Sequence, residues 1–298
     1  MFDVIIVGGG AAGLSAALML GRCCRHVLIC DSGQYRNADA RETHGFLTRD
    51  GITPGDFLEA ARSDLQKYAA VAYKNTEVRD AESTAEGFRV LFPDGSTEIC
   101  RKLLLATGVV DDLPELPNIQ HYYGKSVHHC PYCDGWEWRD KSVAVYGNAK
   151  KGYGLALELT AWTRNLTLCT NGPSTLSSHD RERLERNQIR ICEDYIVDLE
   201  GSEGQLNALV LANNERLPVS ALFFDTGERQ RSYLPAKLGC EFNEHGTVKT
   251  GDYETTTVPG LYVAGDASHG VQSLIVAASE GAQAAFAINT ALLKEKLL

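Results

Sequence analysis

Val4-Ile5-Ile6-Val7-Gly8-Gly9-Gly10-Ala11-Ala12-Gly13 decides the fold of this chain. An apolar run with the length of a buried strand leads directly into three glycines and then into small residues that favour a helix. The spacing Gly8-x-Gly10-x-x-Gly13 matches a dinucleotide-binding turn. The first glycine permits the tight turn, the second lets a pyrophosphate approach the backbone, and the third lets helix and strand pack closely.

The context of this turn strengthens the interpretation. A helix is predicted over residues 11–21 and a strand over 27–30, and Asp31 at the end of that strand is placed to accept a ribose hydroxyl. We include Ala12 among the predicted cofactor contacts. A glycine turn without a ligand is the alternative, but it leaves three glycines and an acid unexplained.

The same pattern occurs a second time in the chain. At one constant offset Gly8 corresponds to Gly147, Gly13 to Gly152 and Cys30 to Cys169. The repeat predicts a strand over residues 143–146, a helix over 153–163 and a strand over 166–169. Two βαβ nucleotide-binding folds are therefore implied.

The predicted fold class is α/β, with two Rossmann-like domains of the three-layer ββα type. The segment after about residue 243 has the pattern of a closing strand and helix, so we expect the second domain to be inserted in the first. The predicted limits are 1–113 with 243–298 for the first domain and 114–242 for the second. Further predicted elements are helices over 56–68 and 271–293 and strands over 89–92, 102–106, 222–225 and 261–264.

Composition excludes some classes of function. The chain has 298 residues and a net charge of -10, with no Lys/Arg run, which argues against nucleic-acid binding. No apolar run approaches the ~20 residues that cross a bilayer, so no membrane role is expected. With nine cysteines and no leader peptide, we expect a cytoplasmic protein in which a disulfide is catalytic rather than structural.

The segment Cys130-Pro131-Tyr132-Cys133-Asp134 carries the clearest chemistry. Two thiols separated by two residues can close a small disulfide, and Cys130 stands where an N-cap would, with Pro131 at the first helical position. A structural zinc site that also uses His128 and His129 is an alternative. Against it, adjacent side chains on a short strand point in opposite directions and the chain holds no second Cys-x-x-Cys pair. We predict no metal.

Two distant segments extend the pattern. Leu104-Leu105-Ala106-Thr107-Gly108 and Tyr262-Val263-Ala264-Gly265-Asp266 are apolar strands that end in small residues, as needed where a backbone passes close to an extended ligand. Together with the glycine turn and the cysteine pair, they make nearly the whole chain resemble the low-molecular-weight thioredoxin reductase family. The resemblance implies that the first nucleotide fold binds FAD.

The resemblance also implies roles for individual residues. Cys133 is expected next to the flavin, Cys130 to attack the partner disulfide, and Asp134 to act as general acid/base, although an acid at a helix N-terminus could simply complement the helix dipole. Asp266 is expected at the ribityl and pyrophosphate region and Gln272 near the flavin ring. Further implied cofactor contacts are Arg36, Asn37, His44, Thr107, Gly108 and Gly265, with an ordinary loop histidine as the alternative for His44.

The expected partner is a thioredoxin-like protein or a small disulfide or dithiol, and a homodimer is implied by resemblance alone. Domain rotation in the family would use residues 113–117 and 242–246 as paired crossovers.

The second nucleotide fold departs from the family. Gly10 corresponds to Ala149 and Asp31 to Thr170, so a close backbone approach and the ribose acid are both lost. NADPH-dependent members carry HRRxxxR after the second strand, whereas residues 170–176 here contain no arginine. Efficient use of NADPH is therefore not expected, and a donor such as ferredoxin is an alternative. So are a dithiol oxidase that passes electrons to oxygen and, in another class, a non-catalytic flavin redox sensor.

Overall fold

The computed structural model describes residues 1–268 and 270–297. The chain forms two compact units. The first comprises Met1–Arg36, Gly45–Val110 and Arg229–Leu298, and the second comprises Asn37–His44 and Asp111–Glu228.

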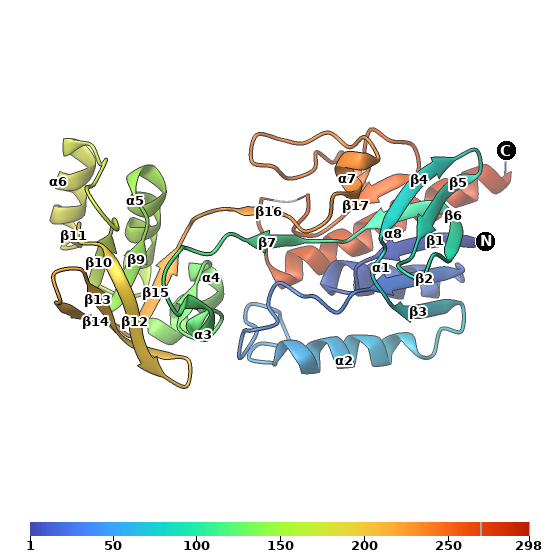
Figure 1. Cartoon of the computed structure of the whole chain (residues 1–298). Coiled ribbons are helices and arrows are strands. Elements are labelled where there is room, and N and C mark those ends of the chain that lie inside the picture. The colour runs from blue at the N-terminus through green and yellow to red at the C-terminus, as the bar shows by residue number, and fades with distance from the viewer. Residues whose placement is uncertain (269, 298) are drawn as a thin grey trace. The chain divides into compact units, whose positions relative to one another are not determined.

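The first unit is built on a seven-stranded sheet of order β3-β2-β1-β6-β5-β4, with β17 pairing β6 (Figure 1). The pairs of β1 with β2 and β6, of β2 with β3 and of β17 with β6 are parallel, and β4 and β5 form an antiparallel hairpin. The strands are β1 (Phe2–Val7), β2 (Val27–Asp31), β3 (Val71–Asn75), β4 (Asp80–Thr84), β5 (Gly87–Leu91), β6 (Thr97–Leu105) and β17 (Leu261–Val263). The helices are α1 (Ala11–Arg22), α2 (Pro54–Leu65), α7 (Leu234–Lys237) and α8 (Leu274–Leu297).

Strand β1 shows why this sheet is buried on both faces. Val4 and Ile6 join a core that includes residues of α1 and α8, whereas Ile5 and Val7 join a second core with Phe88 and other residues. Successive side chains of a strand point to opposite faces, so a continuous apolar run fits a parallel strand covered on both sides.

The second unit repeats this plan on a smaller scale. Its parallel sheet has the order β11-β10-β9-β15-β8, and β12, β13 and β14 form a separate antiparallel sheet. The strands are β8 (Val127–His128), β9 (Val143–Tyr146), β10 (Leu166–Cys169), β11 (Arg190–Cys192), β12 (Ile196–Ser202), β13 (Gln205–Leu211), β14 (Arg216–Pro218) and β15 (Ala221–Phe224). The helices are α3 (Ile119–Tyr122), α4 (Pro131–Asp134), α5 (Ala149–Glu158) and α6 (Ser178–Arg186). The predicted α/β class is confirmed.

The internal repeat extends to strand register. Val4 pairs with Val27 in the first sheet, and the corresponding Val143 pairs with Leu166 in the second. The Gly8 amide donates to the Cys30 carbonyl at 2.8 Å, and the Gly147 amide donates to the Cys169 carbonyl at 3.1 Å. The helix of the second copy begins at Ala149, four residues before the predicted start at residue 153, because the Asn148 side chain caps it by accepting from the Ala149 amide.

The limits of the two units differ from the predicted domain limits in three places, the first being residues 111–113, which lie with the second unit. Residues 229–242 lie with the first unit, since Leu234 and Cys240 are part of its core. Residues 37–44 lie with the second unit, where Arg41 donates to the Glu203 carbonyl at 3.0 Å. Of the four points where the chain passes from one unit to the other, two fall within the two-stranded sheet of β7 (Val109–Asp111) and β16 (Glu228–Gln230).

The cysteines fall into three groups. Cys130 and Cys133 form a disulfide. Cys23 and Cys24 are exposed where α1 ends, and the other five cysteines are buried. In the described part of the chain, none of the helices has both the length and the apolar character needed to span a membrane.

Candidate active site

The turn after β1 contains glycines that are needed for two different reasons. Gly8 has φ +113°, and a Cβ there would lie 2.1 Å from the Ala106 carbonyl oxygen. A Cβ on Gly13 would lie 1.9 Å from the Gly8 carbonyl oxygen. Packing within the protein therefore requires both residues. Around Gly10, by contrast, a Cβ would meet no described atom within 4 Å, so its lack of a side chain serves no internal contact.

The space beside Gly10 is suited to an anionic group. Gly10 is the N-cap of α1, and among the described residues no side chain caps this helix. Its first backbone N–H groups are therefore available to an external acceptor, and the helix dipole favours negative charge there. Just after β6, the buried Thr107 hydroxyl lacks a hydrogen-bond partner among the described residues, and Gly108 has open space at φ +65°. These features fit a bound dinucleotide. Ala12, in the first turn of α1, is buried.

Asp31 lies in a cluster that the sequence did not reveal. The hydroxyls of Tyr35 and Tyr73 donate to its carboxylate, as does the Gly33 amide at 3.0 Å, and the Arg62 guanidinium lies 3.4 Å away. Burial alone would raise the pKa of Asp31, but these hydrogen bonds outweigh it and lower the pKa. Asp31 is thus held as a carboxylate at the end of β2, able to accept hydroxyl groups.

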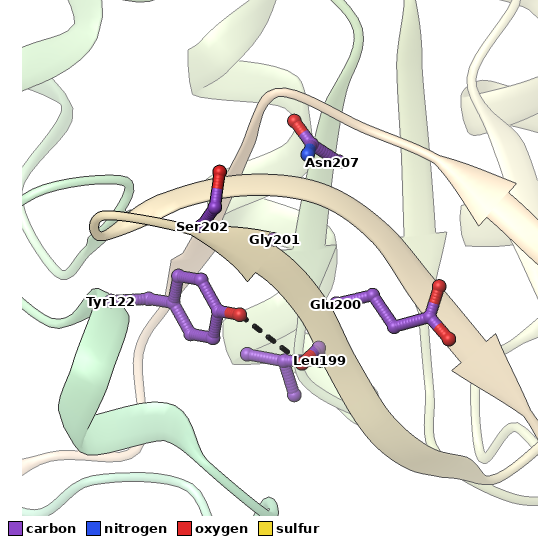
Figure 2. Close-up of a pocket in the computed structure, with 6 residues that line it drawn as sticks. All are labelled: Tyr122, Leu199, Glu200, Gly201, Ser202 and Asn207. Carbon is purple, nitrogen blue, oxygen red and sulfur yellow. Dashed lines mark hydrogen bonds between the residues drawn. The ribbon is translucent and has the colours of Figure 1, made fainter.

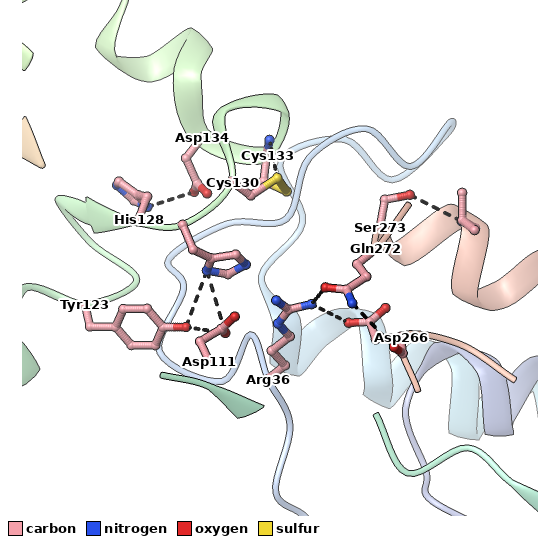
Figure 3. Close-up of a disulfide and its surroundings, with 12 residues drawn as sticks. Arg36, Asp111, Tyr123, His128, Cys130, Cys133, Asp134, Asp266, Gln272 and Ser273 are labelled. Carbon is pink, nitrogen blue, oxygen red and sulfur yellow. Dashed lines mark hydrogen bonds and ion pairs between the residues drawn. A yellow bond between two sulfur atoms is a disulfide. The ribbon is translucent and has the colours of Figure 1, made fainter. Parts of the chain in front are cut away.

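A charged network joins three of the predicted cofactor residues (Figure 3). Arg36 Nη1 lies 2.9 Å from Asp266 Oδ2 and donates to Gln272 Oε1 at 2.5 Å. The preceding Gly265 amide donates to the buried Glu280 carboxylate of α8 at 2.6 Å. The network fixes the turn that follows β17.

Two of the predicted cofactor residues, Asn37 and His44, lie in a different unit from the others. Both belong to the second unit, whereas the remaining predicted cofactor residues belong to the first. His44 Nε2 lies 3.6 Å from Glu42 and 3.7 Å from Glu137. Their role as cofactor contacts stays a prediction.

The redox segment has the predicted local structure. Cys130 is the N-cap of α4 with Pro131 in the first turn, and the Cys133 amide donates to Cys130 Sγ at 3.1 Å. The Cα atoms of the bonded cysteines are 5.3 Å apart, within the usual range for a disulfide. The described residues contain no group of three His, Cys, Asp or Glu side chains that could hold a metal.

The two histidines before the disulfide have different partners, and Figure 3 shows the contact of His128 with Asp134. His128 Nδ1 lies 3.3 Å from Asp134 Oδ1, and the Trp138 indole donates to His128 Nε2 at 3.1 Å. His129 Nδ1 lies 3.7 Å from Asp111, which also accepts from the Tyr123 hydroxyl at 2.7 Å. Sequence reasoning treated both histidines only as possible zinc ligands, and the contact with Trp138 has no sequence signature.

The sequence between and just after the two cysteines carries exposed aromatic side chains. Tyr132, between the cysteines, is 77% exposed and Trp136 is 64% exposed. Tyr132 meets Trp162 edge to face at 5.6 Å, and the Arg139 guanidinium stacks over Trp136 at 4.2 Å.

The turn of the second nucleotide fold is occupied by its own side chains. Asn148 Oδ1 accepts from the Ala149 amide and from the amide and hydroxyl of Thr175, while Asn148 Nδ2 donates to the Pro173 carbonyl. The Thr170 hydroxyl, at the position that corresponds to Asp31, donates to the Gly172 carbonyl at 2.7 Å. The position that corresponds to Gly9 is thereby filled by an amide that ties the turn to residues 173–175.

One pocket of about 480 Å³ lies elsewhere in the second unit (Figure 2). It is lined by Tyr122, Leu199, Glu200, Gly201, Ser202 and Asn207, and the Tyr122 hydroxyl donates to the Leu199 carbonyl at 3.3 Å. The pocket contains no thiol and no predicted site residue, so we do not assign the redox chemistry to it.

Comparison with known proteins agrees with this geometry. The sequence profile of the family described as pyridine nucleotide-disulphide oxidoreductase matches residues 2–281. A probable thioredoxin reductase of Arthroderma benhamiae is 30% identical over 99% of this chain and 81% of its own length. The crystal structure of a putative thioredoxin reductase from Bacillus anthracis superposes with a TM-score of 0.94 at 32% identity, covering 99% of this chain and 100% of that one. The crystal structure of HlmI gives a TM-score of 0.95 at 33% identity, covering 99% of this chain and 94% of that one. The chain is therefore an oxidoreductase of the pyridine nucleotide-disulphide oxidoreductase family and belongs to its FAD-dependent, low-molecular-weight thioredoxin reductase-like branch.

Proposed function

We propose that this protein is an FAD-dependent thiol/disulfide oxidoreductase that exchanges electrons with an external substrate through Cys130 and Cys133. The observation that carries the proposal is the disulfide at the start of α4 with the Asp134 carboxyl group directly behind it. The proposed substrate is a thioredoxin-like protein or a small disulfide or dithiol. A cytoplasmic location and a homodimer are part of the same proposal.

FAD would be held by the first unit. The uncapped N-terminus of α1 at Gly10 would receive the pyrophosphate, and Asp31 would accept a ribose hydroxyl. Thr107 supplies a buried hydroxyl that has no hydrogen-bond partner among the residues the structure describes, and the Arg36–Asp266–Gln272 network would face the remainder of the cofactor. When bound, FAD supplies a two-electron acceptor and donor for the cysteine pair.

The cysteine chemistry follows from thiol-disulfide exchange. In the reductive direction the Cys130 thiolate attacks one sulfur of the substrate disulfide, a mixed disulfide forms, and the other substrate sulfur leaves as a thiolate that takes a proton from Asp134. The Cys133 thiolate then attacks Cys130 Sγ. This second exchange restores the Cys130–Cys133 bond and releases the second substrate thiolate.

We propose that NADPH is a poor electron donor. The Asn148 side chain fills the turn where a pyrophosphate would approach, and Thr170 replaces the acid. Residues 170–176 supply no guanidinium for a 2′-phosphate, and each such charge-assisted bond is worth roughly 1.5–3 kcal/mol. These features favour a ferredoxin-like donor, or the reverse direction, in which a dithiol gives two electrons and two protons to oxygen.

Anaerobic reduction of the flavin separates these cases. We expect the flavin absorbance of the holoenzyme to bleach slowly with NADPH and rapidly with either reduced ferredoxin or dithiothreitol. Rapid bleaching by NADPH would contradict the proposed donor. Oxygen consumption with dithiothreitol in air would assign the oxidase direction, whereas failure of every reductant to bleach the flavin would favour the redox sensor.

Substitutions test the chemistry itself. Serine at Cys130 or at Cys133 should abolish turnover while the flavin remains bound. Asp134→Asn should slow exchange by about a hundredfold, within the range of general acid-base catalysis. Full activity of either serine variant would refute the proposed function.

A further inference from the structure

The tautomer of His128 follows from its contact with Trp138. The indole N–H can only donate a hydrogen bond, and it lies 3.1 Å from His128 Nε2. His128 Nε2 must therefore be an acceptor and carry no proton. Both side chains are buried, with His128 5% and Trp138 7% exposed, so water does not replace this partner readily.

The proton of the neutral ring then lies on Nδ1, which is 3.3 Å from Asp134 Oδ1. The opposite tautomer would direct Nε2–H at the indole N–H and a lone pair at the carboxylate. Both contacts would become repulsive. The buried surroundings therefore select the form of His128 that directs an N–H at Asp134.

The two partners of this contact differ in how firmly they are held. Asp134 ends a four-residue helix, which has few hydrogen bonds of its own. His128 lies on β8, where its backbone pairs with Phe223 of β15 and its ring packs 5.3 Å from the Phe223 ring. The sheet can thus act as the fixed support and the short helix as the supported element.

From these contacts we infer that His128 is a positioning residue for Asp134 and that Trp138 fixes its tautomer. The inference rests on the proposed function of Asp134 and adds the residues that orient its carboxyl group. His128 Nδ1–H orients Oδ1 and leaves Oδ2 to exchange the proton with a substrate or cysteine sulfur. The proton on His128 stays on Nδ1 throughout, so His128 itself transfers no proton.

The tautomer can be measured without any activity. We expect two-bond ¹⁵N–¹H spectra of the holoenzyme labelled at histidine nitrogens, at about pH 8 where an ordinary imidazole is neutral, to show His128 protonated at Nδ1. Trp138→Phe, which keeps an aromatic ring in the core, should lose this preference. The histidine signal that is missing from the spectrum of His128→Asn is the signal of His128. An Nε2-protonated His128 in the parent protein would overturn the inference.

The positioning role is tested by the rate at which dithiothreitol reduces the Cys130–Cys133 disulfide, followed anaerobically by acid quench and alkylation. His128→Leu should slow this step by about tenfold, and His128→Asn, which retains an N–H near the Nδ1 position, should recover most of the rate. His128→Leu combined with Asp134→Asn should be no slower than Asp134→Asn alone, because the two residues act as a unit.

The outcomes distinguish the two claims. If Asp134→Asn leaves the rate unchanged, the proposed acid/base function fails while the tautomer measurement still stands. If Asp134→Asn is slow and His128→Leu retains full rate, the inference about His128 fails and the proposed function stands. Flavin absorbance and far-ultraviolet circular dichroism of each variant verify that it is folded.

Discussion

Two kinds of contact act on the residues of the first nucleotide-binding fold: close packing in the glycine turn and long-range hydrogen bonds at Asp31. Spacing identifies Gly8, Gly10 and Gly13 because a dinucleotide-binding turn takes glycine at fixed intervals, Gly8 and Gly13 for packing within the protein and Gly10 for the approach of a ligand. Tyr73 reaches Asp31 from 42 residues away, and Arg62 from 31 residues away. Nothing in a local pattern encodes such partners, because Tyr73 on β3 and Arg62 on α2 approach Asp31 only in the folded chain.

Gly10 and Gly13 provide a matched pair of variants. Gly10→Ala introduces a methyl group into open space at φ -80°, so the free energy of unfolding of the apoprotein should fall by less than about 1 kcal/mol, while flavin affinity should fall at least about tenfold. Gly13→Ala places its Cβ 1.9 Å from the Gly8 carbonyl oxygen and should lose both flavin and stability. The ratio of flavin to protein absorbance and urea unfolding measure the two effects. A Gly10→Ala protein with a full complement of flavin would show that no phosphate lies there.

At the scale of elements, the repeat was predicted better than the boundaries. The strands β9 and β10 were placed correctly because an apolar run between glycines has few other interpretations. The start of α5 was wrong by four residues because apolar periodicity does not show the cap that Asn148 forms on the adjacent Ala149 amide, and residues 173–175 contact the same side chain only in the folded chain.

Asn148 should therefore stabilise the second unit. We expect Asn148→Ala to lower its free energy of unfolding by about 1–2 kcal/mol, through loss of the cap and of the contacts with Thr175 and Pro173. Asn148→Asp keeps the acceptor oxygen and loses only the donor to Pro173, so its loss should be smaller. Urea unfolding of both variants gives the comparison, and equal losses would contradict the assignment. Neither change should improve the use of NADPH, since residues 170–176 contain no arginine.

For the whole molecule, each unit has its own pair of apolar cores. The first unit also contains a buried pair of acids. Burial, and then the neighbouring Glu280, raises the pKa of Glu254 from 4.5 to about 7.

The raised pKa predicts the direction of a pH effect. Between about pH 4.5 and 7 the folded protein keeps a proton that the unfolded chain releases, so this group's contribution to stability is complete below that range and is lost as pH rises through it. The loss should reach about 3 kcal/mol near pH 8. Glu254→Gln should remove this dependence and make the first unit more stable than the parent at about pH 8 but not at about pH 5. Parallel stability curves for the two proteins would contradict the shift.

The exposed pair Cys23 and Cys24 has a practical consequence for any titration with a colorimetric thiol reagent. The oxidised native protein should react rapidly at two sulfurs that take no part in turnover, and pre-reduction should raise the rapid count to four as Cys130 and Cys133 become available. A Cys23→Ser, Cys24→Ser background would bring the resting signal to near zero. Every equivalent of chromophore that the reagent then releases would come from Cys130 and Cys133 alone.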